Sequence, residues 1–439
     1  MDIRTTGYQV ITPGIRHLEK SMFLCADLDA FFVAVEQALN PSLIGKAVIV
    51  GGLPEERGVV ASASYEARKF GIHSGMPTAQ AYRLCPHALF LRGNFKNYAY
   101  YSNKFHQILT SYSPEVNMVS IDEAYLNIKG TERLFGPPEV LAQRLKTEIK
   151  KTLNISVSIG IARTKVFSKI ACEQSKPDGN LFVTPENETK FLAPLKVSVL
   201  PGIGPKHLSI LSNLNINTIE ELMTQPDWVL ETALGNYHKI LKFFIHGGDY
   251  QITDGIQSIS RETTLPEDTI NKNLIYALFL YLIERGCTTL REKKLLAKIL
   301  TVKIRFSDFK TISKRTRIPF NNAQQKIFEC GTHILENLLK EKKRVRLIGI
   351  ALSGLTYDGL QPSIFKVREE RINRLNYALD HIRHKFGFNS LYPANTIILK
   401  EGYRCSSHGN DARIVRRHSY TGKENKKRLM NNDTGFHVL

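Results

Sequence analysis

The sequence predicts a multidomain protein of mixed α and β structure, and three observations support this class. The chain has 439 residues, enough for about three domains of ordinary size. Near its start, the short apolar run Met22 to Ala26 is typical of a strand buried on both faces, and "FFVAVEQAL" follows with helical spacing. Farther along, residues 258–355 alternate strand and helix patterns. These patterns together predict an α+β chain.

Charge and composition indicate which classes of partner this protein would bind. Sixty Lys and Arg against 41 Asp and Glu leave a formal charge of +19, which favours polyanionic partners. The longest apolar stretch, Leu274 to Ile283, is shorter than the roughly 18 residues of a membrane span. The N-terminus "MDIRTTGYQV" has no basic region followed by an apolar one, and the six cysteines form no CxxC pair. We therefore expect a cytoplasmic protein with reduced thiols and no membrane association.

Two aspartates end the first strand. In "CADLDAFF", period-two geometry places Asp27 and Asp29 on the same side of the strand. A strand-to-helix junction exposes backbone and often collects ligands. The alternative is an Asp that caps the following helix.

A second acidic pair, Asp122 and Glu123, lies in the β-like segment "VSIDEAYLNI". Unpaired carboxylates in a sheet repel one another and resist desolvation, so the cluster indicates bound cations. Mg²⁺ fits best, because it prefers oxygen ligands and binds through carboxylates and substrate phosphates. Two such ions about 3.5–4 Å apart would clamp the attacking and leaving oxygens of a phosphoryl transfer.

Groups that could hold a triphosphate occur in two further segments. "SYEARKFGIHSGM" places Tyr65 and Arg68 on one helical face, and "SKPDG" places Lys176 in a turn before Pro177. Each of these signals is weak alone, because single cations of this kind are usually ordinary surface residues.

Four segments in this order, "DLDAFFVAVEQ", "YEARKFGIHSGMP", "SIDEAYL" and "SKIACEQSKPDG", resemble the Y-family translesion DNA polymerases, closest to the bacterial DNA polymerase IV group. The resemblance covers roughly residues 20 to 355. It implies a right-hand polymerase with a ferredoxin-like palm, small fingers, a helical helix-hairpin-helix thumb and an α/β little finger domain. The implied boundaries are palm 20–31 and 94–183, fingers 32–93, thumb 184–248, linker 249–257, little finger 258–358 and a C-terminal extension 359–439.

The resemblance also implies roles for individual residues. Asp27, Asp122 and Glu123 would be catalytic and bind two Mg²⁺ ions, with the main-chain carbonyl of Leu28 as a further ligand, and Glu123 would be the most sensitive to mutation. The nucleotide-binding residues would be Phe31, Phe32, Tyr65, Arg68 and Lys176. Phe32 would exclude the ribose 2′-hydroxyl, although plain core packing also explains a phenylalanine there.

The resemblance implies that the polyanionic partner of this basic chain is primer-template DNA. "VLPGIGPKHLSILSNLNINTIEEL" resembles a helix-hairpin-helix, in which the backbone near Gly202 and Gly204 would bind a DNA phosphate. In the strand pattern "TVKIRF", Lys303 and Arg305 fall on the face opposite Val302 and Ile304. This basic face would contact phosphates, and a merely solvated face is the alternative.

The segment "QPSIF" resembles the short peptides that bind a sliding clamp, with Gln361, Ile364 and Phe365 as anchors. It departs from the family pattern by Pro362 where Leu is frequent, and a plain linker is the alternative. A helix with apolar spacing at Ile372, Leu375, Leu379 and Ile382 follows.

The sequence thus predicts a monomeric, DNA-templated DNA polymerase that uses deoxynucleoside triphosphates and performs error-prone translesion synthesis. Two other classes stay open. A non-catalytic, clamp-bound DNA-binding protein would lack one of the acids, and all three are present. A nucleotidyl cyclase also uses paired carboxylates and two metals, but it has no need of a helix-hairpin-helix or a basic domain.

Overall fold

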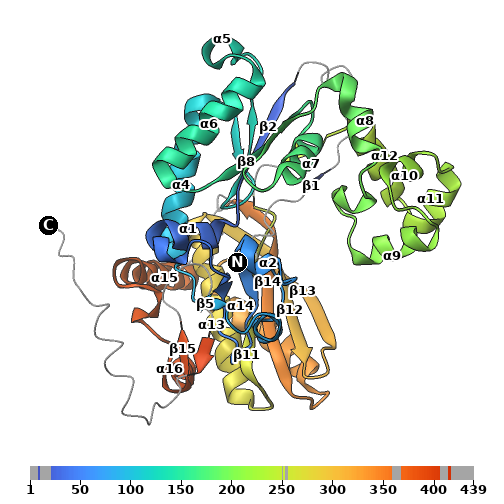
Figure 1. Ribbon diagram of the computed structural model, residues 1–439. Coiled ribbons are helices and arrows are strands. Elements are labelled where there is room, and N and C mark those ends of the chain that lie inside the picture. Colours follow the sequence, from blue (N-terminus) through green and yellow to red (C-terminus); the bar gives the residue numbers. More distant parts are fainter. Residues whose placement is uncertain are drawn as a thin grey trace. The chain divides into compact units, whose positions relative to one another are not determined.

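The computed structural model describes residues 8–9, 21–249, 251–252, 256–357, 367–405 and 414–416 (Figure 1). The chain divides into two compact units, Ile3–Gln257 and Ser258–Leu439. Among the described residues, none of the helices has the length and apolar character that crossing a membrane requires. The predicted clamp-binding residues Gln361, Ile364 and Phe365 lie outside the described residues.

The first unit contains a five-stranded sheet with β2 at its centre. The strand order is β6-β7-β2-β8-β9, in which β2 is antiparallel to both of its neighbours and β8 is parallel to β9. The strands are β2 (Phe23–Leu28), β6 (Val116–Met118), β7 (Glu123–Asn127), β8 (Val157–Ala162) and β9 (Asn180–Phe182). The predicted buried strand is confirmed, because Leu24, Cys25 and Ala26 are inaccessible to solvent.

Helices cover the two faces of this sheet. Leu24, Ala26 and Leu28 pack into one large apolar core together with residues of α4 (Phe95–Tyr112) and α6 (Pro138–Leu153). Cys25 and Asp27 alternate with them and face α7 (Lys165–Ser175), on the other side. Figure 1 shows α7 beside β2 and β8. The period-two alternation of β2 therefore directs its acid toward α7.

Gly160 in β8 allows α7 to approach the sheet closely. A Cβ atom at this position would lie 2.1 Å from the Ser168 carbonyl oxygen and 2.2 Å from the Cys172 amide nitrogen. Both atoms are backbone atoms of α7 and cannot rotate away.

We expect Gly160→Ala to lower the free energy of unfolding by about 3 kcal/mol, the upper range for overpacking. Urea denaturation measures this. Gly204→Ala is the control, because a Cβ there meets no atom within 4 Å, and its cost should stay below about 1 kcal/mol. Equal effects of the two variants would refute the packing argument.

A smaller sheet and the first helix follow β2. Helix α1 (Phe31–Leu39) begins where predicted, and the three-stranded sheet has the order β4-β3-β5. This part comprises β3 (Val48–Gly51), β4 (Val60–Ala63), β5 (Leu89–Leu91), α2 (Tyr65–Arg68), α3 (Thr78–Leu84) and the 3-10 helix η2 (Pro41–Leu43). It has its own small apolar core that includes Ile49, Val60 and Ile72.

The rest of the first unit is mainly helical. It comprises α5 (Glu132–Phe135), η3 (Pro185–Asn187), α8 (Glu188–Leu192), η4 (Val197–Val199), α9 (Pro205–Asn213), α10 (Ile219–Met223), α11 (Asp227–Leu234) and α12 (Tyr237–Ile245), with the short strands β1 (Tyr8–Gln9) and β10 (Gln251–Ile252). The apolar residues of α8 to α12 share a core with Val166 and Phe167 of α7. These helices are therefore anchored on the same helix that covers β2.

A tight turn precedes α9, at the position where the sequence predicts a hairpin. Gly202 has φ +82°, which favours glycine, and a Cβ on it would collide with the Tyr237 hydroxyl. Leu200, Ile203 and Leu211 are buried beneath it. The turn is thus fixed both by backbone conformation and by close packing.

The second unit is built on an antiparallel four-stranded sheet of order β11-β14-β12-β13. Its main elements are β11 (Ser258–Thr269), α13 (Lys272–Glu292), β12 (Leu295–Phe306), β13 (Thr311–Asn321), α14 (Gln324–Leu339) and β14 (Val345–Tyr357). The predicted alternation is confirmed, because Val302, Ile304 and Phe306 are fully buried while Lys303 and Arg305 are on the partly exposed face.

The segment after the second sheet contains α15 (Val367–Phe386), η5 (Phe388–Ser390), η6 (Ala394–Thr396), α16 (Ile397–Gly402), β15 (Tyr403–Cys405) and β16 (Ile414–Arg416). Leu375 of the apolar series is 50% exposed, whereas Asn376 and Arg383 are buried. The polar side of α15 faces inward because α13 presents Glu284 to Arg383 and Arg291 to Asp380. Helical spacing alone did not reveal which side of this helix packs.

Candidate active site

Asp27 and Glu123 lie directly opposite each other on neighbouring strands. The register pairs Asp27 with Glu123 across β2 and β7, at the end of β2. Their side chains are only 11% and 17% exposed. Two like charges at paired positions repel one another, so this arrangement requires compensating cations.

Asp122 adjoins this pair. Its backbone carbonyl accepts a hydrogen bond of 3.0 Å from the amide of Leu28, and its carboxylate accepts one from the Ser120 hydroxyl. Burial, and then the negative charges of Asp27 and Glu123, raise the pKa of Asp122 against the opposing effect of Ser120. The three predicted acids are therefore within electrostatic reach of one another.

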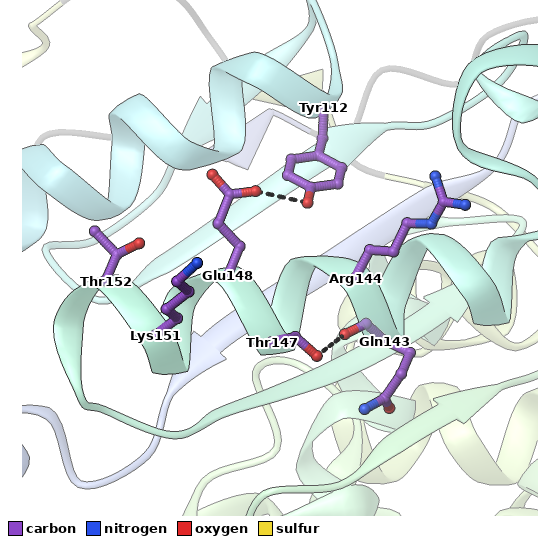
Figure 2. Close-up of a pocket in the computed structure, with 7 residues that line it drawn as sticks. All are labelled: Tyr112, Gln143, Arg144, Thr147, Glu148, Lys151 and Thr152. Atoms are coloured by element: carbon purple, nitrogen blue, oxygen red, sulfur yellow. Dashed lines mark hydrogen bonds between the residues drawn. The ribbon is translucent and has the colours of Figure 1, made fainter.

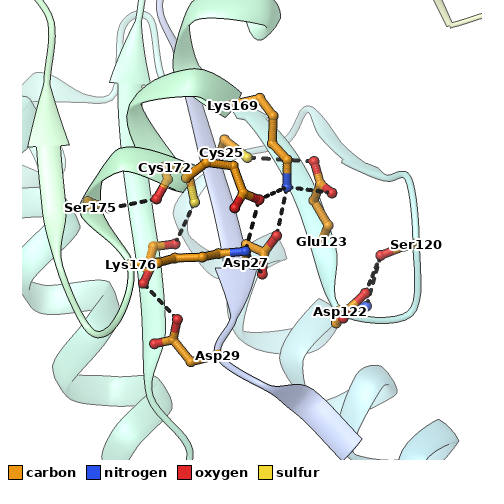
Figure 3. A network of polar contacts seen from close by, with 12 residues as sticks. Cys25, Asp27, Asp29, Ser120, Asp122, Glu123, Lys169, Cys172, Ser175 and Lys176 are labelled. Carbon is orange, nitrogen blue, oxygen red and sulfur yellow. Dashed lines mark hydrogen bonds and ion pairs between the residues drawn. The ribbon is translucent and has the colours of Figure 1, made fainter. Parts of the chain in front are cut away.

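Two lysines contact Asp27 and Glu123, as Figure 3 shows. The Lys169 ammonium lies 2.7 Å from a carboxylate oxygen of Asp27 and 2.9 Å from one of Glu123. Lys176 contacts the other oxygen of Asp27 at 2.9 Å. Burial alone would lower the pKa of Lys169, but the surrounding acidic groups, first of all Asp27, raise it. Lys169 thus remains a cation among the carboxylates.

Asp29 has a different environment from Asp27. It is 2% exposed and accepts hydrogen bonds from the Ser158 hydroxyl at 2.8 Å, the Asp178 amide at 2.9 Å and the Tyr65 hydroxyl at 3.3 Å. It caps no helix, since the N-cap of α1 is Ala30 and has no side-chain hydrogen bond. Asp29 therefore fixes Tyr65 and the turn after Lys176 relative to β2.

Tyr65 and Arg68 lie on α2, which begins with a hydrogen bond from the Ala67 amide to the Ser64 hydroxyl. The Arg68 guanidinium lies over the Tyr65 ring, 4.8 Å from its centroid, and its Nε donates to the carbonyl of Ala63 at 3.0 Å. Burial, and next the charge of Asp29, raise the pKa of Tyr65 to about 12. The tyrosine is therefore a neutral hydrogen-bond donor at physiological pH.

The two phenylalanines after Ala30 occupy different environments. Phe31 is 3% exposed and belongs to the main core, whereas Phe32 is partly buried. The Phe32 ring stacks on Tyr98 at 4.4 Å between centroids and meets Phe95 edge-on at 5.7 Å. Phe32 is thus held in place by aromatic neighbours while part of it stays accessible.

The sequence alone did not single out Lys169 and Glu173. Lys169 and Glu173 lie on α7, and Lys176 is the residue that ends it. Glu173 accepts contacts of 2.8 Å from Lys169 and 2.9 Å from Lys176. The spacing of four residues between Lys169 and Glu173 in "SKIACEQSK" predicts an ion pair on one side of a helix, but not its contact with the acids of the sheet.

The residues predicted to bind DNA lie elsewhere. Gly202 and Gly204 precede α9, and a Cβ on Gly204 would meet no atom within 4 Å, so its backbone is open. In the second unit, Lys303 pairs with Glu262 at 2.7 Å and Arg305 donates to the Thr311 hydroxyl at 2.8 Å.

A surface hollow of about 610 Å³ lies on the outer side of α4 and α6 (Figure 2). Its lining includes Arg144, Lys151 and the Tyr112 hydroxyl, which donates to Glu148 at 2.7 Å. Helices α4 and α6 cover the sheet face opposite the acids, so we assign this hollow no part in the chemistry.

The donor set suits a hard divalent cation. Among the residues that the structure describes, no three His, Cys, Asp or Glu side chains are grouped as a ready metal site. Asp122 is hydrogen bonded to Ser120, and the Lys169 ammonium lies between Asp27 and Glu123. A site of carboxylate oxygens that already attracts a cation nevertheless fits Mg²⁺.

Comparisons with known proteins show the family of this chain. The impB/mucB/samB family matches residues 26–173, and the impB/mucB/samB family C-terminal domain matches residues 256–364. The DNA polymerase IV of Dehalococcoides mccartyi strain 195 is 43% identical over 380 residues, which cover 85% of this chain and 97% of that protein. The chain belongs to the Y family of DNA polymerases.

Solved structures of Y-family enzymes share the fold. A Y-family DNA polymerase chimera of Dbh and Dpo4 has a TM-score of 0.68 and 27% identity, covering 76% of this chain and 99% of that one. An insertion ternary complex of Dbh DNA polymerase has a TM-score of 0.54 and 26% identity, covering 76% of this chain and 98% of that one. The mixed α and β fold class predicted from the sequence is confirmed.

Proposed function

We propose that this Y-family protein is a DNA-templated DNA polymerase that performs error-prone translesion synthesis, adding deoxynucleotides to a primer 3′-hydroxyl. The observation that carries this proposal is the pairing of Asp27 with Glu123 across two strands, with Asp122 beside them. The family membership supports the polymerase activity, and the paired acids support the reaction class.

Asp27, Asp122 and Glu123, with the main-chain carbonyl of Leu28, would hold two Mg²⁺ ions. When bound, such ions acidify the primer hydroxyl and neutralise the charge that develops on the leaving pyrophosphate. The protein contributes the positions of these carboxylates, which the β2–β7 register fixes. No side-chain nucleophile is needed, since positioning of the reacting groups and electrostatic stabilisation of the transition state account for nearly all of the catalysis of phosphoryl transfer.

Tyr65, Arg68 and Lys176 would hold the triphosphate. The Tyr65 hydroxyl has a single proton, which it would donate to a phosphate in place of Asp29, and the two cations would compensate phosphate charge. Asp29 orients this set, because it bonds both the Tyr65 hydroxyl and the amide that follows Pro177. Lys176 would exchange its contact with Asp27 for the phosphates.

Phe31 and Phe32 would line the nucleotide pocket, with Phe32 against the deoxyribose. We expect Phe32→Ala to raise the incorporation of ribonucleotides relative to deoxynucleotides about tenfold or more, because removal of the ring relieves a clash with the 2′-hydroxyl. The measurement is kcat/KM for both nucleotides. Phe135→Ala is the matched control, since that ring stacks on Tyr112 instead. Unchanged selectivity in Phe32→Ala would refute this role.

The domain assignment is part of the proposal. The five-stranded sheet with α4, α6 and α7 would be the palm (20–31 and 94–183), and the three-stranded sheet would belong to the fingers (32–93). The helices α8 to α12 would be the thumb (184–248), and residues 249–257 a linker to the little finger (258–358). The extension 359–439 would include the clamp-binding peptide.

Primer-template DNA would be held without sequence readout. The backbone near Gly202 and Gly204, which is open at Gly204, would bind a phosphate. Lys303 and Arg305 would contact the duplex backbone. A sliding clamp would dock on Gln361, Ile364 and Phe365. We propose that the enzyme acts as a monomer in the cytoplasm.

Primer extension with Mg²⁺ and each deoxynucleoside triphosphate tests the function. A templated, stepwise product supports the polymerase, and the same reaction on a template with an abasic site tests lesion bypass. A cyclic nucleotide formed from free triphosphate without DNA would instead indicate a cyclase. DNA binding without any product would indicate a non-catalytic binding protein.

A further inference from the structure

The Lys169 side chain lies between two carboxylates, those of Asp27 and Glu123. Its ammonium contacts Asp27 at 2.7 Å and Glu123 at 2.9 Å, and thereby neutralises two acids that face each other across β2 and β7. A lysine side chain is a compact point charge on a flexible stem, so it can leave such a position.

Glu173 offers Lys169 an alternative partner. It lies one helical turn farther along α7 and is 2.8 Å from the Lys169 ammonium and 2.9 Å from that of Lys176. Its side chain is 45% exposed, and it forms ion pairs with both of these lysines. Lys169 therefore contacts Glu173 and two acids that we assign to metal binding, Asp27 and Glu123. Lys176 contacts Glu173 and one such acid, Asp27. Figure 3 shows the contacts of both lysines with the assigned metal ligands.

Metal binding and the lysine contacts compete. A divalent ion and an ammonium group within 3 Å of the same carboxylate oxygen repel each other, and at such distances this repulsion is large in a partly buried site. The ammonium must therefore move away from Asp27 and Glu123 when the ion binds. Glu173 is already in contact with both lysines and can hold them after they leave.

We propose that Lys169 and Glu173 of α7, together with Lys176 directly after it, form an ion-exchange device. In the metal-free enzyme the two lysines neutralise Asp27 and Glu123, and Glu173 retains the lysines when divalent ions take those carboxylates. Glu173 is thus a positioning residue, which acts on metal and triphosphate binding through the two lysines. This inference rests on the function proposed above for Asp27 and Glu123.

The device predicts opposite effects for two substitutions. Lys169→Met removes the competing cation, so the dissociation constant for Mn²⁺ should fall about tenfold, equivalent to about 1.4 kcal/mol. Glu173→Gln removes the alternative acceptor of the lysines, so the dissociation constant for Mn²⁺ should rise about threefold or more. A merely structural role of this network would weaken binding in both variants.

The measurement is Mn²⁺ binding to the full chain by electron paramagnetic resonance, without DNA or nucleotide. Lys169→Arg keeps the positive charge and should bind Mn²⁺ nearly as the wild type does. Lys150→Met, an exposed lysine on α6, is the control for loss of one charge. Unchanged or weaker binding by Lys169→Met would overturn the proposal, as would tighter binding by Glu173→Gln.

Thermal melting gives a second readout. In EDTA, Lys169→Met should melt below the wild type because Asp27 and Glu123 then repel without a counter-ion, and Mn²⁺ should restore its melting temperature. Failure of Mn²⁺ to restore it would overturn the proposal. Asp27→Asn distinguishes failure of the proposed metal site from failure of the proposed exchange. If Asp27→Asn binds Mn²⁺ as the wild type does, the assignment of the metal site is wrong. If Asp27→Asn loses Mn²⁺ binding but Lys169→Met does not bind Mn²⁺ more tightly, only the exchange is refuted.

Discussion

Glu123→Gln is expected to slow nucleotide addition by at least about a thousandfold, a loss of about 4 kcal/mol of transition-state stabilisation. Glutamine has nearly the same shape but no charge, so it weakens metal binding without creating a cavity. The position is sensitive because Glu123 lies opposite Asp27 in the β2–β7 register, where we assign it to metal binding.

Single-turnover primer extension measures this loss, and the melting temperature shows whether the fold is retained. Glu148→Gln is the matched control, since Glu148 lies on α6, accepts a hydrogen bond from Tyr112, and is on the opposite side of the sheet from the acids. Wild-type rates in Glu123→Gln would refute the assignment of this acid to catalysis.

The sequence predicted the strand that carries the first acid because β2 combines two clear signals. Its continuous apolar run indicates burial on both faces, and period two determines which residues share a side. Leu24 and Ala26 indeed pack on α4 and α6, and Asp27 faces α7. The same reasoning predicted the alternation of Val302 with Lys303 in β12.

The arrangement around the acids could not be predicted in the same way. Lys169 and Glu173 resemble ordinary surface residues on a helix, because their partners lie on strands distant in the chain, with Asp27 separated from Lys169 by 142 residues. Only the approach of α7 to β8 at Gly160 brings them together. Local spacing contains no information about such a contact.

The packing side of helix α15 could not be predicted from its sequence either. Apolar spacing indicates the side of a helix that usually packs, but the decision depends on the partner surface. Here α13 presents Glu284 and Arg291, so the complementary residues of α15 are Arg383 and Asp380. The second unit thereby buries an ion pair where the sequence suggested apolar contact.

Arg383→Met is expected to lower the free energy of unfolding of the second unit by about 3–5 kcal/mol, because it leaves the Glu284 carboxylate buried without its partner. The two side chains are 3% and 2% exposed and 2.8 Å apart. The double variant Glu284→Met/Arg383→Met removes both charges and should recover most of the loss. Lys343→Met is the control, since its pair with Asp308 is well exposed and its loss should leave the stability of the second unit nearly unchanged.

Hydrogen exchange of the α13 and β12 amides under increasing urea reports on the second unit. Fluorescence of Trp228, the single tryptophan, reports separately on the first unit and should not change. A double variant no more stable than Arg383→Met would show that the loss arises from packing rather than from the uncompensated charge.

The loss of stability caused by Arg383→Met should also depend on pH, and it should be smaller at acidic pH. Burial already raises the pKa of Glu284, while Arg383 and then Arg291 oppose that rise. Removing Arg383 raises the folded-state pKa further above the unfolded value, so the folded variant takes up a proton more readily than the unfolded chain. Stability of Arg383→Met should therefore increase as the pH falls from neutrality toward 5, by linkage, and the gap to the wild type should narrow. A gap that widens on acidification would mean that Glu284 is not the group responsible.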